Sequence, residues 1–139
     1  MRLFAVVLLT LAGAGSSACG SDSPSQASSL AGVYTATVFR VTPTGQSAID
    51  VLAQGGTLSI TIASDNTASG TLSLPASVAG TAFSASMAGT VVQTGTTVRF
   101  EQTADTFVRD LTFTVVGNTL QTTSQVAGAG SFTITLTRQ

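Results

Sequence analysis

The chain has 139 residues, of which 43% are hydrophobic and only 8% are charged, and its formal net charge is −1 at pH 7. This length favours a single domain, and the lack of a basic excess excludes a nucleic-acid-binding surface and a polybasic attraction to anionic lipid. The sequence contains no His, Lys or Trp, so His-based and Lys-based catalysis are excluded as well.

The first eighteen residues have the layout of a secretory signal peptide. Arg2 supplies a positive start, residues 3–12 are almost entirely apolar, and residues 13–18 are small. The apolar run is too short to span a bilayer as a permanent helix. We therefore predict a cleaved signal helix within residues 1–18, and export of the protein.

Cys19, the sole cysteine, allows two interpretations. The stretch "SSAC" resembles the lipobox of bacterial lipoproteins, although Ser16 stands where a larger aliphatic residue is preferred. The alternative is ordinary cleavage after Ala18. We favour acylation of Cys19, because residues 20–29 form a polar, Ser-rich tether and acyl chains would anchor the chain firmly. Gly20 does not resemble the Asp that retains lipoproteins in the inner membrane, so we expect the outer membrane or the cell surface.

Beyond residue 30, apolar and hydroxyl side chains alternate. "TLSITI" (57–62) and "FTITLTR" (132–138) each present one apolar face and one Thr/Ser face, as half-buried antiparallel strands do. Turn residues recur about every ten positions. The predicted strands are 31–41, 47–63, 68–75, 81–93, 97–103, 107–116, 119–126 and 131–138.

Turn lengths that agree with the alternation predict the register of several hairpins. Gly55-Gly56 is expected to form a bulge or bend that changes the buried face within the strand 47–63. Turns are expected at Thr94-Gly95, near Ala104-Asp105 and at Gly117-Asn118, with a three-residue loop at 65–67. The expected opposed pairs are Val91 with Val98, Ile60 with Leu72, Val115 with Leu120 and Arg99 with Asp110.

Eight short strands in sequence, joined by short links, favour a closed barrel, because closure removes exposed strand edges. We predict an all-β, eight-stranded antiparallel up-and-down barrel over residues 30–139, following the signal segment (1–18) and the lipidated Cys with its tether (19–29). A transmembrane barrel is excluded because the outer face is Thr/Ser-rich and lacks Trp.

The segments "LAGVYTAT" (30–37) and "FTITLTR" (132–138) resemble the first and last strands of lipocalin-like bacterial lipoproteins. In that group a Gly-x-Trp on the first strand packs near an Arg on the last strand. Gly32, Tyr34 and Arg138 occupy comparable places here, with Tyr in place of Trp. The resemblance implies an eight-stranded barrel. It implies ligand binding only weakly, because such barrels host many functions.

The sequence offers no constellation for catalysis, a metal ion or a cofactor. Asp65 and Asp105 fall in expected turns, where Asp is commonly structural, and Glu101 and Asp110 are expected to point outward. We therefore predict no catalytic residue, no metal site and no cofactor.

The larger apolar side chains fall mostly on the inward parity of their strands. They either line a cavity for a small hydrophobic ligand or fill the barrel, and we favour a filled core because eight strands enclose little space. Arg109 shares the inward parity of Phe107, but we favour exposure at the barrel rim. The candidate interior residues are Tyr34, Phe83, Met87, Phe100, Phe107, Phe113 and Phe132.

The leading hypothesis is a non-catalytic exported envelope lipoprotein that is held at a membrane through Cys19 and binds a small apolar ligand in the barrel. The alternative is a structural or protein-interaction module of the cell envelope with a filled barrel core. Neither hypothesis involves nucleic acid.

Overall fold

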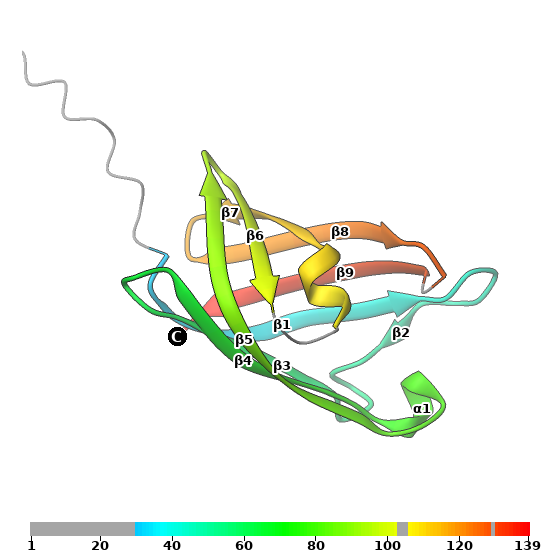
Figure 1. Ribbon diagram of the computed structural model, residues 1–139. Coiled ribbons are helices and arrows are strands. Elements are labelled where there is room, and N and C mark those ends of the chain that lie inside the picture. Colours follow the sequence, from blue (N-terminus) through cyan, green and yellow to red (C-terminus); the bar gives the residue numbers. More distant parts are fainter. Residues whose placement is uncertain (1–29, 103–105, 129) are drawn as a thin grey trace, which may run out of the picture.

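The computed structural model describes residues 30–102, 106–128 and 130–139; the predicted signal helix, Cys19 and the tether to residue 29 lie outside the described residues. Strands make up nearly all of the regular structure (Figure 1). They are β1 (Gly32–Thr42), β2 (Ile49–Asp50), β3 (Thr57–Ile62), β4 (Thr67–Leu74), β5 (Phe83–Thr94), β6 (Thr97–Gln102), β7 (Thr112–Val116), β8 (Thr119–Val126) and β9 (Gly130–Arg138). Two short helices are also present, α1 (Ala76–Ala79) and the 3-10 helix η1 (Phe107–Asp110).

The strands form one closed antiparallel sheet. From β3 to β9 each strand pairs with the next, and β1 closes the barrel by pairing with β3 on one edge and β9 on the other. The two-residue β2 pairs with Arg40 and Val41, on the edge of β1 that also pairs with β3. It therefore occupies the same position around the barrel as β3. The prediction of an eight-stranded antiparallel barrel is confirmed.

The segment 47–63, predicted as one strand, is interrupted by a turn. Val51 is fully buried, and its amide donates to the Phe39 carbonyl at 2.8 Å before the chain turns. The Gly56 amide then donates to the Val51 carbonyl at 2.8 Å. A Cβ on Gly56 would overlap Cγ1 of Val51, so only glycine fits this return. The change of buried face at Gly55-Gly56 therefore arises from a turn and not from a bulge.

Residues 107–110, predicted as the start of a strand, form η1. Val108 and Leu111 are both fully buried, and their spacing of three matches the 3-10 repeat. The predicted pairing of Arg99 with Asp110 is wrong, because Arg99 lies opposite Thr112. Arg109 is exposed on η1, with its Nε 3.8 Å from Oδ1 of Asp110.

The β7–β8 hairpin has the predicted register, with Val115 opposite Leu120 around a turn at 117–118. In the β5–β6 hairpin, by contrast, Val91 lies opposite Phe100, and the turn is Gly95-Thr96. Gly95 has φ 61°, which suits the first central position of a type II′ turn.

The β3–β4 register also differs from the prediction by two residues. Ile60 lies opposite Gly70 instead of Leu72, and the three-residue loop is 64–66 instead of 65–67. Asn66 adopts φ 64° at the last loop position. A two-residue shift leaves every side chain on its original face, so the alternation could not discriminate between the two registers.

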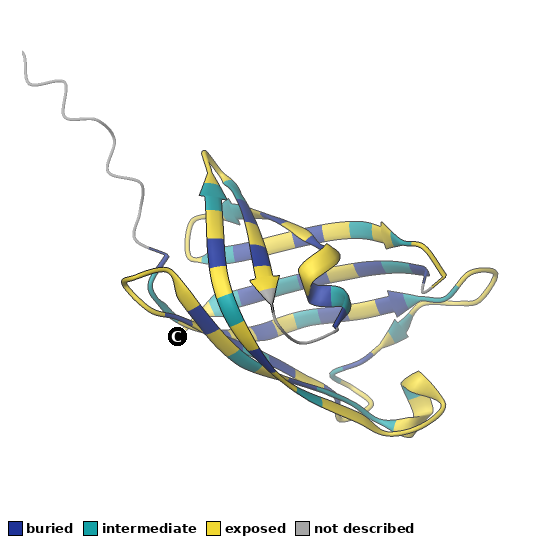
Figure 2. Ribbon diagram, in the orientation of Figure 1, coloured by how far each residue is buried: buried dark blue, intermediate teal, exposed yellow. Residues whose placement is uncertain are grey.

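Buried and exposed positions alternate along the strands (Figure 2). The buried side chains are almost all apolar, and many of the exposed ones carry hydroxyl groups. The rings of Phe100 and Phe113 meet edge to face in the interior, with centroids 5.4 Å apart. On the outside, Ser59 and Thr71 form a cross-strand hydrogen bond of 3.2 Å. Fully buried side chains include Phe39, Leu58, Ile60, Ile62, Leu72, Leu111, Leu120, Ile134 and Leu136.

Strand direction defines two ends of the barrel (Figure 1). The terminal end holds Leu30, the C-terminus and the hairpin turns at 64–66, 95–96 and 117–118. The helix end holds α1, η1 and the loop at 43–48. The chain therefore enters the barrel at the end opposite to the two helices.

Candidate functional site

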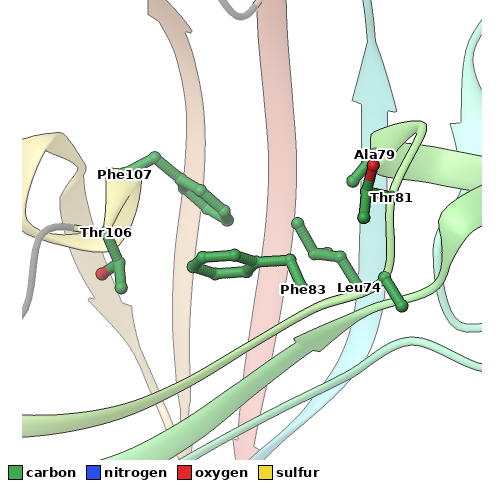
Figure 3. Close-up of a pocket in the computed structure, with 7 residues that line it drawn as sticks. Leu74, Ala79, Thr81, Phe83, Thr106 and Phe107 are labelled. Carbon is green, nitrogen blue, oxygen red and sulfur yellow. The ribbon is translucent and has the colours of Figure 1, made fainter.

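A pocket of about 420 Å³ lies at the helix end of the barrel (Figure 3). It is formed by the end of β4, α1 and the loop that follows it, the start of β5, and the start of η1. Its lining residues are Leu74, Ala79, Thr81, Ala82, Phe83, Thr106 and Phe107.

The pocket lies at the start of β5, where this strand pairs with the end of β4. Leu74, the last residue of β4, lies opposite Phe83, the first residue of β5. The described pairs between β5 and β6 begin only at Gly89. Pro75 ends β4, since it cannot donate to a sheet, and the chain returns to β5 through α1. Phe83 is consequently 41% exposed although its ring is apolar.

The opposite wall of the pocket is held by an aromatic cluster. The Phe107 ring stacks on Phe132, with centroids 4.4 Å apart and planes at 22°, and lies 6.1 Å from the ring of Phe39. Figure 3 shows the side chains of Phe83 and Phe107 directed toward each other across the pocket. One ring is therefore fixed by stacking, and the facing ring is partly open to solvent.

The predicted interior residues divide into two groups. Phe83 and Phe107 line the pocket. Tyr34, Met87, Phe100, Phe113 and Phe132 are buried in the hydrophobic cluster. Within the core, the Thr106 hydroxyl donates to Sδ of Met87 at 3.7 Å.

The remaining lining residues were not predicted from the sequence. Leu74 is the last residue of β4, Ala79 is the last residue of α1, and Thr81, Ala82 and Thr106 lie in irregular segments. Strand alternation assigns faces only within strands, so it gave no signal for the four residues outside β4. Pro75, followed by several small residues, marked a break in the strand pattern at this place.

The described residues that line the pocket carry no charge. Its polar groups include the hydroxyls of Thr81 and Thr106. Arg109 has a carboxylate partner in Asp110, and Arg40 on β1 lies 4.0 Å from Asp50. These two arginines at the helix end thus each lie close to a carboxylate at the surface.

A second cluster, at the terminal end, joins Gly32, Tyr34 and Arg138. Tyr34 lies opposite Arg138 across the β1–β9 closure. The Tyr34 hydroxyl donates to the Leu30 carbonyl at 2.9 Å, and its side chain is buried. A Cβ on Gly32 would lie 2.5 Å from Nε of Arg138, so the arginine crosses directly over the glycine. This arrangement covers the terminal end of the core.

Tyr34 gives a spectroscopic test of this cluster. Burial raises the pKa of the phenol above its ordinary value of 10.0, and the positive charge of Arg138 opposes that shift. Because the chain has a single Tyr and no Trp, ultraviolet absorbance reports this group alone. We expect the titration midpoint of the native protein to lie above that of the urea-unfolded protein.

The same shift predicts how stability depends on pH. As the pH rises, the phenol ionises in the unfolded protein before it ionises in the folded protein, and this favours unfolding. The stability that the neutral Tyr34 side chain contributes is therefore complete below pH 10 and is lost as the pH rises through the pKa of the folded protein. Tyr34→Phe should abolish this alkaline loss, and it should cost about 1 kcal/mol at neutral pH because the bond to Leu30 is removed. Equal midpoints in the native and unfolded protein would contradict the burial of Tyr34.

A further hollow, of about 320 Å³, lies on the outer face over β7, β8 and β9. Val116, which is 51% exposed, contributes its main apolar surface, and threonines form most of the remainder. The lining residues are Thr114, Val116, Gln121, Thr122, Thr123, Thr133, Ile134 and Thr135.

Within residues 30–102, 106–128 and 130–139, no three His, Cys, Asp or Glu side chains gather to hold a metal ion. Over the same residues, no helix has the length and apolar character needed to cross a bilayer. Comparison with protein-family models, with curated proteins and with solved structures finds no match for this chain.

Proposed function

We propose that the protein is a non-catalytic exported envelope lipoprotein of lipocalin-like type that binds a small hydrophobic ligand. The observation that carries the proposal is the apolar pocket at the helix end, where Phe83 remains 41% exposed. Its volume of about 420 Å³ falls within the range of small-molecule sites. The ligand would therefore bind at the mouth of the barrel and not in its packed centre.

The direction of the chain supports a function at a membrane surface. Residue 30 lies at the terminal end, and the pocket lies at the helix end. An acylated Cys19 would be joined to the terminal end by residues 19–29, a segment of about 40 Å when fully extended. In this proposal the pocket opens away from the point of attachment, so the ligand arrives from the aqueous side.

Mass spectrometry of the protein purified from membranes tests the anchor. The expected mass is that of residues 19–139 plus the acyl groups on Cys19. A Cys19→Ser variant should be exported without acyl groups and recovered in the soluble fraction. An unmodified Cys19 in the membrane-purified protein would contradict the anchor. It would leave ordinary cleavage after Ala18 as the processing route.

Native mass spectrometry of the same sample tests ligand binding. We expect a co-purifying small molecule that is released by organic extraction and is lost in a Phe83→Ala variant. A Val92→Ala variant is the matched control, because Val92 lies on the same strand and is 44% exposed outside the pocket. Retention of the molecule by Phe83→Ala would place its site elsewhere.

The alternative is an interaction module of the envelope, and the hollow on the outer face favours it. A protein partner seated there would contact Val116 and the surrounding hydroxyl groups. Val116→Asp would then abolish recovery of that partner by crosslinking and leave ligand binding at the helix end unchanged. If the protein instead serves only to bind a ligand in the pocket, the same variant should have no effect.

A further inference from the structure

We propose that the pocket at the helix end selects an uncharged, ring-containing ligand and discriminates against anionic amphiphiles. This inference rests on the proposed function, since it specifies the chemistry of the molecule that the same pocket would hold. It is carried by two observations, the charge distribution around the pocket and the arrangement of its two phenylalanine rings.

The charge distribution disfavours an anion. None of the seven lining residues is ionisable. Two arginines at this end of the barrel already have carboxylate partners, with 3.8 Å between Arg109 and Asp110 and 4.0 Å between Arg40 and Asp50. Glu101, near the end of β6, adds a further exposed carboxylate at this end of the barrel. A ligand carboxylate or sulfonate would be desolvated without gaining a counter-ion, which is unfavourable.

The arrangement of the rings favours a planar ligand. The Phe107 ring is held in place by stacking on Phe132 at 4.4 Å, so it offers a fixed apolar surface. Phe83 is directed toward it from the opposite wall, with Leu74 beside it (Figure 3). A flat apolar molecule between the two side chains would gain offset or edge-to-face contacts and would cover the exposed part of Phe83.

The hydroxyl of Thr81 allows the ligand one neutral polar group. Thr81 is exposed beside the pocket and can donate to or accept from a hydroxyl or carbonyl group. The chemical class is thus a small aromatic or otherwise ring-containing molecule, either purely apolar or carrying a neutral oxygen group.

Two fluorescent probes with the same ring framework test this inference. N-phenyl-1-naphthylamine is neutral, whereas 1-anilinonaphthalene-8-sulfonate carries a sulfonate on the same skeleton. The exported full chain carrying Cys19→Ser is used in every titration, so that no acyl chain competes for the probe. We expect the neutral probe to bind about tenfold or more tightly than the sulfonated probe, because only the latter must desolvate a charge.

Two variants locate the probe. Phe83→Ala should weaken binding of the neutral probe about tenfold, and Val92→Ala should leave it unchanged. Because Phe83 is already 41% exposed, its replacement should not unfold the protein, and circular dichroism verifies this.

The outcomes separate this inference from the proposed function. Equal or tighter binding of the sulfonated probe, still sensitive to Phe83→Ala, would overturn the inference and leave the proposed function standing. Failure of both probes to bind the folded protein would overturn the proposed function itself. Binding of the neutral probe that does not respond to Phe83→Ala would overturn the assignment of the pocket.

Discussion

Replacing Phe113 with alanine is expected to lower the free energy of unfolding by about 3–5 kcal/mol. Phe113 is fully buried, and its ring meets Phe100 edge to face at 5.4 Å, so truncation removes apolar contacts and leaves a cavity in the middle of the barrel. Urea denaturation followed by far-ultraviolet circular dichroism measures the change.

Thr114→Ala is the matched control for this substitution. Thr114 is the next residue of β7 and is exposed on the outer face. Its replacement should cost about 1 kcal/mol or less. If the two variants lost similar amounts of stability, Phe113 would not lie in the core and the assigned faces of β7 would be wrong.

The second large effect is expected at the seam where the barrel closes. Gly130 begins β9 with φ 99°, and a Cβ there would overlap the Thr42 carbonyl oxygen and lie 2.9 Å from Cα of Pro43. Gly130→Ala therefore adds a backbone clash to the strain of a positive φ. It should cost about 3 kcal/mol or more in the free energy of unfolding.

Gly128→Ala separates the two contributions. Gly128 also has a positive φ, of 79°, but a Cβ there would meet nothing within 4 Å. We expect Gly128→Ala to lower the free energy of unfolding by about 1–2 kcal/mol from backbone strain alone, as measured by urea denaturation. Equal losses at the two glycines would show that the start of β9 does not approach Thr42 closely enough to exclude a side chain.

The alternation of apolar and hydroxyl residues was sufficient to predict the fold. It correctly assigned the inward residues of β3 and β9, because each strand has one buried and one exposed face. It could not fix the pairing of Ile60 or of Val91, because registers that differ by two residues bury the same side chains. The turn residues reduced this ambiguity only for the hairpin at Gly117, whose predicted register is confirmed.

The residues of the candidate site were harder to predict from the sequence than the strands of the barrel. Phe83 and Phe107 were identified from their size and parity, but Phe107 lies in η1, where strand parity does not apply. These two differ from buried Phe100 because they lie at the helix end of the barrel, at the start of β5 and of η1, and this is a property of the three-dimensional structure. In contrast, Gly32, Tyr34 and Arg138 lie close together where β1 pairs with β9.

Backbone nuclear Overhauser effects between β1 and β9 test the closure of the barrel, which defines both ends and hence the pocket. Closure predicts cross-strand contacts between Ala36 and Leu136 and between Phe39 and Ile134, in addition to those between Leu120 and Leu136 within the β8–β9 hairpin. If the β8–β9 contacts were observed and both β1–β9 contacts were missing, the sheet would be open, which would contradict the closed barrel and the pocket at its mouth.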